Sequence, residues 1–450
     1  MKKLLLIIPA FCILQASAQT IVKQDGIIKQ MVDEVSAKNI EANIRKLVSF
    51  KSRHTLSDTT SKTEGSGAAR NWIKAEMEKY AAESQGRLTV QFDTFTQPKS
   101  ERVDKPYHLK NVLATLKGTD ANDTRVYIVS GHYDSRVNDV MNANSVEPGA
   151  NDDASGSAVS MELARVMSKW SFPSTIIFMC VVGEEQGLYG STNVAKRAKA
   201  EKWNVDAMLN NDIVGNTHGM ETDLKDNRSV RVFSEGVPST AAGNEREIRS
   251  LISLGGENDS PSRELARYVK ETGERYVDQL DVKLIYRRDR FLRGGDHVPF
   301  LQQGFTAVRF TEMNEDFNRQ HQDIRTEKGV DYGDLPDFVD FNYVQKVARM
   351  NLSVLANLAM APAEPENVGV VTSDLTNRTV LKWEAPKAGK KPAGYYVLMR
   401  ESVSPYWEKK FYVEGTGISL AYSKDNYFFA VQSVDDKGHE SLPVYPKPVH

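Results

Sequence analysis

The stretch Thr175-Ile-Ile-Phe-Met-Cys-Val-Val182 decides the fold, because it is apolar along almost its whole length and leads directly into Gly183-Glu-Glu-Gln-Gly187. A strand with one solvated face alternates between apolar and polar residues, whereas a strand covered on both faces is apolar throughout. Val126-Tyr-Ile-Val-Ser130 is a second buried-strand candidate, and Ala154–Lys169 between the two has apolar residues at helical spacing. This order predicts a parallel sheet with helices on both faces.

The same alternation of strands and helices extends to both sides of this core. Residues 20–85 are expected to be mostly helical, and Ser262–Gln279 has the pattern of a further helix. Further short strands are expected at Leu88–Phe92, Asn111–Leu116, Met208–Asp212, Val282–Tyr286 and Ala307–Phe310. We therefore predict an α/β domain over residues 19–360, built on a doubly wound, mostly parallel sheet flanked by helices.

A second domain is indicated by the change in composition at Ala361-Pro-Ala-Glu-Pro365. Beyond this segment the residues alternate as in β-strands, and turn residues such as Asp435-Asp-Lys-Gly438 separate the strands. We predict a small all-β sandwich over residues 361–450. It resembles a fibronectin type III domain in the segments Leu381-Lys-Trp383, Gly394-Tyr-Tyr-Val397 and Tyr427-Phe-Phe-Ala-Val-Gln-Ser-Val434.

Residues 1–18 have the features of a signal peptide. Two lysines follow the first methionine, Leu4 to Leu14 is almost wholly apolar, and Ala16-Ser-Ala18 is a small-residue cleavage site. We therefore expect an exported protein, periplasmic or extracellular. No later stretch approaches the roughly 20 apolar residues of a membrane helix, so no membrane span is expected.

Charge and cysteine content narrow the possible functions. The 58 basic and 60 acidic residues give a formal net charge of −2, which gives no reason to expect nucleic acid or an anionic membrane as a partner. Removal of a signal peptide that carries Cys12 leaves Cys180, so an intrachain disulfide is impossible in the mature chain. Cys180 lies in the apolar run, and we interpret it as a buried strand residue rather than a nucleophile.

Polar side chains follow each of the central predicted strands. Because ligands bind outside the carboxyl ends of the strands in open α/β sheets, these side chains are expected to converge there. Any one carboxylate has an ordinary alternative, since Asp152 or Asp153 could simply cap the helix that begins near Ala154. The joint pattern of imidazole and carboxylates favours a zinc site that activates water. The residues concerned are His132, Asp152, Asp153, Glu184, Glu185 and Asp212.

Five motifs, in this order, resemble those of the zinc peptidase family M28, and the resemblance covers roughly residues 30–355. They are His132-Tyr-Asp134, Gly149-Ala-Asn-Asp-Asp153, Gly183-Glu-Glu-Gln-Gly187, Asn211-Asp-Ile-Val-Gly215 and His321. The resemblance implies two neighbouring zinc ions. His132 and Asp212 would bind one ion, Glu185 and His321 the other, and Asp152 would bridge them. Glu184 would be the general base.

Other polar residues near the motifs have expected supporting roles. Asp134 is a candidate acceptor for the His132 imidazole. Choosing Asp152 over Asp153 as the ligand comes from the family pattern, and Asp153 then supports the site or positions substrate. Asp296 and His297 are expected at the rim, where they would position substrate, with helix capping as the alternative. Many relatives have Tyr before the last His, where this chain has Gln320, so the assistance of a tyrosine to the oxyanion is in doubt.

These observations favour a secreted zinc aminopeptidase that acts on peptides with a free N-terminus. One alternative is a glutaminyl cyclase, which has a similar fold and a single zinc and transfers an amine within its substrate. Another is a non-catalytic binding protein that has kept the fold. Zinc counting together with a peptide assay would separate these hypotheses. The polar residues 216–262 are expected to form an insertion near the rim of the site, which could shape specificity.

Overall fold

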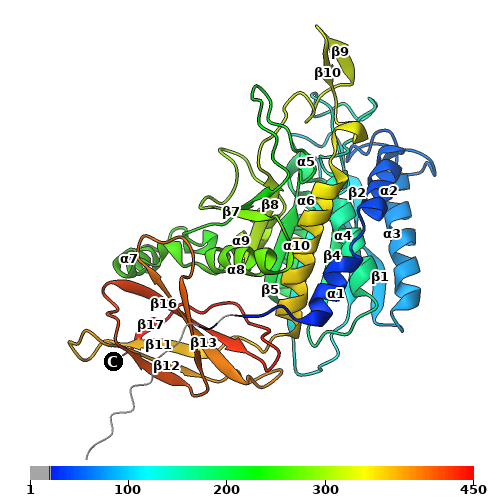
Figure 1. Ribbon diagram of the computed structural model, residues 1–450. Coiled ribbons are helices and arrows are strands. Elements are labelled where there is room, and N and C mark those ends of the chain that lie inside the picture. The colour runs from blue at the N-terminus through cyan, green and yellow to red at the C-terminus, as the bar shows by residue number, and fades with distance from the viewer. Residues whose placement is uncertain (1–19, 21, 450) are drawn as a thin grey trace, which may run out of the picture.

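The structure is a computed structural model that describes residues 20 and 22–449, so the predicted signal peptide lies outside the described residues. Within them, strands pair into a mixed sheet of eight strands in the order β1-β2-β4-β3-β5-β8-β6-β7 (Figure 1). The strands are β1 (Leu88–Gln97), β2 (Tyr107–Leu116), β3 (Arg125–His132), β4 (Thr175–Val181), β5 (Asn204–Asn211), β6 (Ser229–Phe233), β7 (Asp281–Ile285) and β8 (Ala307–Glu312).

The centre of this sheet is parallel. β3 pairs in parallel with β4 on one side and with β5 on the other, and β5 continues in parallel to β8. β1 and β2 form an antiparallel edge, and β6 pairs antiparallel to β8. The predicted α/β fold with a mostly parallel, doubly wound sheet is confirmed.

Helices cover both faces of the sheet (Figure 1). One face is covered by α1 (Gly26–Glu34), α2 (Ala37–Val48), α3 (Gly65–Glu83), α4 (Ala154–Met167), α8 (Pro261–Tyr276) and α10 (Phe341–Met360). The other face is covered by α6 (Tyr189–Ala200) and α9 (His297–Gln302).

The side chains of β4 explain why its sequence is apolar throughout. Ile176, Phe178 and Cys180 lie in the core on the α4 face, while Ile177 and Met179 lie in the core on the α6 face. Burial of each large apolar side chain contributes about 1.5–3 kcal/mol, so both faces of this strand stabilise the sheet. Cys180 is fully buried, as the sequence predicted.

Residues 216–262 differ from the insertion that the sequence predicted. β6 lies within this segment and is part of the central sheet, between β8 and β7. The rest includes η1 (Ser239–Ala241), the helix α7 (Glu245–Leu254) and η2 (Gly256–Asn258). The C-terminal end of α7 approaches the C-terminal domain, where Tyr445 Oη donates to Leu254 O at 3.3 Å. The α7 part therefore borders the C-terminal domain, whereas Asn216 at the start of the segment lines a small cavity together with Asp152 and Gln320 of the site. None of the α7 residues is buried, although Ile248, Leu251 and Ile252 recur at helical spacing.

The C-terminal domain consists of two packed β-sheets, of strand orders β15-β12-β11-β17 and β14-β13-β16. Leu381, Trp383, Val397, Phe411 and Val431 form much of the apolar core between them. The predicted all-β sandwich is thus present, and its likeness to fibronectin type III stays a prediction. The strands are β11 (Glu366–Val371), β12 (Thr379–Glu384), β13 (Gly394–Glu401), β14 (Lys409–Val413), β15 (Gly417–Leu420), β16 (Tyr427–Val434) and β17 (Lys447–Val449).

Short elements complete the structure. They are α5 (Glu184–Gly187), the hairpin of β9 (Arg325–Glu327) and β10 (Val330–Tyr332), and η3 (Pro336–Phe338). The hairpin projects from the end of the molecule opposite the C-terminal domain (Figure 1). Among the described residues, no helix is both long and apolar enough to cross a membrane.

Buried ion pairs join the C-terminal domain to α8 and the loop before it. Arg400 Nη2 lies 2.8 Å from Asp259 Oδ1, and Arg267 Nη1 of α8 lies at the same distance from that oxygen. Arg275 Nη1, near the end of α8, lies 2.9 Å from Glu440 Oε2. Side chains of Arg400 and Asp259 are at most 1% exposed, so neither charge has water as an alternative partner.

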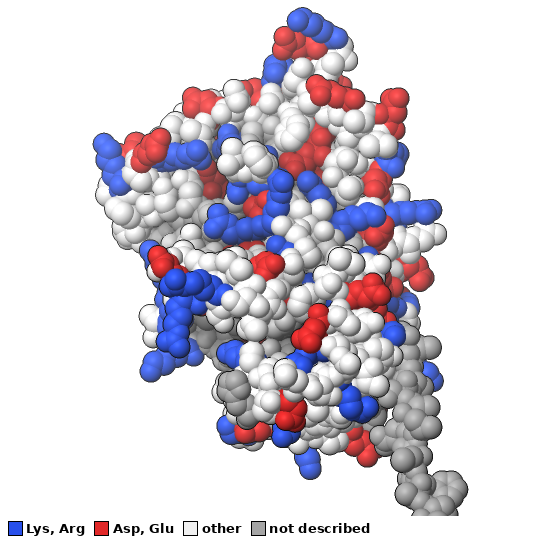
Figure 2. Space-filling view, turned by 90° about the vertical axis from the view of Figure 1, so that its left-hand side faces the viewer, with Lys and Arg blue, Asp and Glu red and all other residues white. Residues whose placement is uncertain are grey.

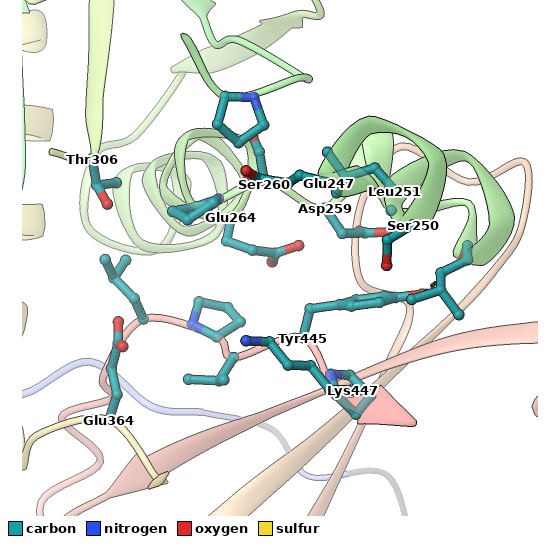
Figure 3. Close-up of a pocket in the computed structure, with 18 of the residues that line it drawn as sticks. Glu247, Ser250, Leu251, Asp259, Ser260, Glu264, Thr306, Glu364, Tyr445 and Lys447 are labelled. Carbon is teal, nitrogen blue, oxygen red and sulfur yellow. Dashed lines mark hydrogen bonds between the residues drawn. The ribbon is translucent and has the colours of Figure 1, made fainter. Parts of the chain in front are cut away.

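A cavity of about 810 Å³ remains beside this interface. Figure 3 shows Ser260 and Glu264 on one side of it and Tyr445 and Lys447 on the other. Thr306, just before β8, also lines it, so the cavity lies at the amino ends of the strands. Since α/β enzymes bind ligands at the carboxyl ends, this cavity is not the expected catalytic pocket.

The buried pair predicts a large effect for Arg400→Met, which removes the charge and keeps an apolar stem. Asp259 loses one of its two guanidinium partners, so we expect the free energy of unfolding to fall by about 3 kcal/mol. Urea denaturation measures this change. Lys387→Met is the control, because Lys387 pairs with Glu366 in an exposed ion pair and its loss should leave stability unchanged. Equal losses in both variants would show that the buried pair does not anchor the domain.

Candidate metal centre

The predicted site residues lie at the carboxyl ends of the parallel strands. His132 is the last residue of β3, Glu184 and Glu185 begin α5 just after β4, and Asp212 follows β5. The connection from β3 leads to β4 on one side, and the chain then crosses to β5 on the other side. Such a reversal of strand order opens a crevice at the strand ends, and the fold therefore directs these side chains into one crevice.

Five side chains form two groups that share Asp152. His132, Asp152 and Asp212 form one group, and Asp152, Glu185 and His321 form the other, with the ligand atoms of each group within 4.8 Å of one another. Asp152 Oδ1 lies 3.3 Å from His132 Nε2, and Asp152 Oδ2 lies 2.9 Å from His321 Nε2. The two oxygens of one carboxylate thus face different groups.

His132 shows that its group fits a metal ion. Its Nδ1 lies 3.0 Å from the carbonyl oxygen of Asp134, to which it can only donate, so Nε2 is the nitrogen that would face a metal ion. Nε2 is buried and makes no well-aligned hydrogen bond to any described residue, although Asp152 Oδ1 lies 3.3 Å and Asp212 Oδ2 3.9 Å away. Buried polar atoms are normally satisfied. A zinc ion between this nitrogen and the carboxylates would satisfy it.

The concentration of acidic groups shifts the proton affinities of the site. Burial, together with the charges of Asp212 and Glu185, raises the pKa of Glu184 well above its ordinary value. Burial alone would lower the pKa of His132, but the nearby carboxylates of Asp153 and Asp134 outweigh it and raise that pKa well above the ordinary value.

Asp134 and Asp153 accept hydrogen bonds that hold residues of the two groups in place. Asp134 Oδ2 accepts hydrogen bonds from Thr55 Oγ1 at 2.6 Å and from the Glu185 amide at 3.3 Å. Asp153 is the N-cap of α4, where Oδ1 accepts from the Gly156 amide, and its Oδ2 accepts from the His132 amide, both at 2.9 Å. Asp153 thus caps α4, which the sequence analysis gave as an alternative role for this residue. It also fixes the end of β3.

Two residues that the sequence did not single out hold the Asp152 loop. Asp334 accepts hydrogen bonds from the amides of Asn151, at 2.8 and 2.9 Å, and Asp152, at 2.7 Å. Arg53 is fully buried and donates to the carbonyl oxygens of Pro148 and Gly149 in the same loop. No local signal could have found them, because their partners are backbone groups far away in the chain.

Asp296 and His297 do not lie where the sequence predicted them. Both are fully buried, so neither is at the rim. Asp296 occupies the N-cap position of α9 but makes no capping hydrogen bond, and it accepts one from Ser191 Oγ instead. His297 Nε2 lies 2.7 Å from the carbonyl oxygen of Arg288. Both residues are packed at the buried start of α9, where Asp296 takes the N-cap position that was the alternative from the sequence.

A cleft of about 340 Å³ opens over the two groups. Glu184 and Gln320 line it beside the candidate ligands, and Gln320 Nε2 donates to Asp152 Oδ2 at 2.9 Å. Arginines line its other walls. Figure 2 shows a face of the molecule on which Lys and Arg side chains gather beside acidic side chains near the middle.

Comparisons with known proteins agree with this geometry. Residues 111–334 match the sequence profile of Peptidase family M28. A protein of Pyrenophora teres f. teres named "Probable zinc metalloprotease" is 48% identical over 425 residues, which are 94% of this chain and 87% of that protein.

Solved structures of low sequence identity share the fold. The LapA aminopeptidase of Legionella pneumophila has a TM-score of 0.52 at 19% identity and covers 80% of this chain and 80% of its own. The glutaminyl cyclase of Macrostomum lignano has a TM-score of 0.51 at 16% identity, covering 75% of this chain and 94% of its own.

The two candidate histidines can be separated by their zinc content. We expect His321→Ala to lower bound zinc, because Asp152 and Glu185 lose their only neighbouring nitrogen ligand within that group. His297→Ala should keep the zinc and lower the melting temperature, because it empties a buried position. Elemental analysis and thermal unfolding measure both effects. Zinc loss in His297→Ala with full zinc in His321→Ala would show that the wrong histidine has been chosen.

Proposed function

Because this chain belongs to peptidase family M28, we propose that it is a zinc-dependent aminopeptidase that removes N-terminal residues from peptides. Membership makes the chain a zinc metallopeptidase. The proposal adds two zinc ions, a requirement for a free N-terminus, and Glu184 as the general base. It also adds export to the periplasm or the extracellular space, for which the sequence of residues 1–18 is the support.

The observation that carries the two-zinc proposal is the position of Asp152. A carboxylate whose two oxygens face two separate ligand groups would suit a pair of neighbouring zinc ions. His132 and Asp212 would complete one ion's ligands, and Glu185 and His321 those of the other. Glu185 and His321 also contact Arg136, at 2.9 and 2.7 Å, so the count of zinc ions has to be measured.

The catalytic proposal assigns the proton transfers to Glu184. Bound zinc lowers the pKa of water and polarises the scissile carbonyl. Glu184 lines the cleft and is the neighbour of the candidate ligand Glu185, so its carboxylate can take a proton from the attacking water. It then returns this proton to the leaving amine, which would otherwise be a poor leaving group. Asp134 and Asp153 keep the imidazole of His132 in place throughout.

The free N-terminus of the substrate is a cation and requires acidic partners. In the cleft these are the carboxylates of Glu184, Asp152 and Asp212. An N-terminal residue held there places its own carbonyl at the metal centre, and cleavage then releases that single residue. This arrangement supports an exopeptidase rather than an enzyme that cuts within long chains.

Replacing Glu184 by Gln tests the general base. The variant keeps the size of the side chain, so zinc content should be unchanged, while kcat for a short peptide should fall by a factor of about 10²–10⁴. Glu83→Gln is the control, since it makes the same chemical change at an exposed position of α3. Turnover near that of the unmodified protein, with zinc intact, would refute the role of Glu184.

Metal counting tests the stoichiometry and the cyclase alternative together. Elemental analysis of freshly purified protein should find two zinc ions per chain, and a chelator should abolish hydrolysis until zinc is restored. One tightly held zinc, with no gain in activity when more is added, would contradict the two-zinc site. If the protein with one zinc cyclises an N-terminal glutamine, the glutaminyl cyclase hypothesis is then favoured. Full zinc without any turnover would favour the binding protein.

A further inference from the structure

Arginines form a large part of the walls of the catalytic cleft. Arg102, Arg136, Arg290 and Arg293 all line it. Two of them are held by structural partners, since Arg136 Nε lies 2.9 Å from Glu185 Oε2 and Arg290 Nη1 lies 3.0 Å from Glu315 Oε2. The other two, Arg102 and Arg293, have N–H donors that are available to a ligand.

Arg102 lies in the loop between β1 and β2 and is exposed. Its Nη1 donates to the carbonyl oxygen of Glu185 at 3.2 Å. Within the described part of the chain, no carboxylate lies within 4.0 Å of its guanidinium nitrogens, so its charge has no direct counterion. A guanidinium carries five N–H donors in a fixed plane, and most of those of Arg102 are therefore available to a ligand.

Arg293 ends the basic segment Arg287-Arg-Asp-Arg-Phe-Leu-Arg293, which follows β7. Its side chain is 35% exposed, and its contact with Glu315 is long, at 3.6 Å. Glu315 is already shared with Arg231 at 2.8 Å and with Arg290 at 3.0 Å. Asp289 also lies 3.4 Å from Arg290, but it is shared with Arg309 at 3.1 Å. The two carboxylates cannot neutralise four guanidinium groups, so a positive charge is left at this wall of the cleft.

These charges divide the cleft into two parts. The carboxylates at its base suit the ammonium group of the N-terminal residue, whereas Arg102 and Arg293 would repel it. With the ammonium group at the base, the arginines are left to contact other parts of the peptide, such as the residue after the scissile bond. Guanidinium groups bind carboxylates through paired, charge-assisted hydrogen bonds.

We propose that this cleft selects peptides with a carboxylate on the residue that follows the scissile bond. The inference rests on the proposed aminopeptidase function, which fixes the direction of the peptide. Two sources supply the same chemistry: the side chain of an acidic second residue, and the C-terminal carboxylate of a dipeptide. The substrates are then acidic peptides or dipeptides.

Three peptides with a free N-terminus separate these sources. Leu-Gln-amide has no carboxylate, Leu-Glu-amide has one on its side chain, and Leu-Gln has one at its C-terminus. For the zinc-loaded enzyme we expect kcat/KM to be about tenfold or more higher for at least one of the charged peptides than for Leu-Gln-amide, which is the scale of a charge-assisted hydrogen bond. The peptide that is preferred identifies the source.

Variants test whether the two arginines cause the preference. Arg102→Gln combined with Arg293→Gln should reduce the ratio of kcat/KM between charged and neutral peptides to about one. Arg287→Gln is the matched control, because Arg287 is an exposed arginine of the same segment that lines a different cavity. It should keep the ratio of the unmodified enzyme. A ratio near one in the unmodified enzyme, or an unchanged ratio in the double variant, would overturn the inference.

A binding measurement keeps this inference distinct from the proposed function. Calorimetry of the three peptides with zinc-loaded Glu184→Gln protein reports affinity without turnover. Tighter binding of a charged peptide, lost in the arginine double variant, supports the cleft preference even if the unmodified enzyme hydrolyses none of them, and the aminopeptidase proposal then fails alone. Hydrolysis of all three peptides at one rate, with equal affinities, leaves the aminopeptidase and refutes the preference.

Discussion

The mutual repulsion of buried carboxylates is the constraint on which this structure depends. Asp152, Asp153, Glu185 and Asp212 all lie within the crevice at the strand ends, and each is largely buried. Like charges held in a low-dielectric interior destabilise the folded state unless cations or hydrogen bonds compensate them. The chain supplies part of the compensation through backbone amides and Arg309, whose Nη2 lies 2.9 Å from Asp212 Oδ2. Metal ions would supply the rest, so binding of zinc and stability of the fold are linked.

The central sheet could be predicted from the sequence because its signal is local. In β4, neighbouring side chains enter opposite cores, and a strand in that position has to be apolar at every residue. β6 gave no such signal, since Ser229-Val-Arg-Val-Phe233 is short and polar segments flank it. Its place in the sheet comes from pairing with β7 and β8, which are distant in the chain.

The candidate site was predictable to the extent that its residues follow strands. His132, Glu184, Glu185 and Asp212 were placed by that rule, and the structure brings them together. His321 follows no such rule, and its assignment came from the family pattern. Asp334 and Arg53 were missed because a side chain that binds backbone groups leaves no pattern in the sequence. Asp296 and His297 were misplaced, because local sequence does not show whether a loop lies at the rim or behind the site.

The interface with the C-terminal domain lies at the amino ends of the central strands, whereas the metal centre lies at their carboxyl ends. Arg125, the first residue of β3, donates to the carbonyl oxygen of Ala361, whereas His132, the last residue of the same strand, faces the site. One strand therefore separates two surfaces that share no residues. Selection can alter the accessory domain, or the substrates and surfaces it meets, without any compensating change among the ligands.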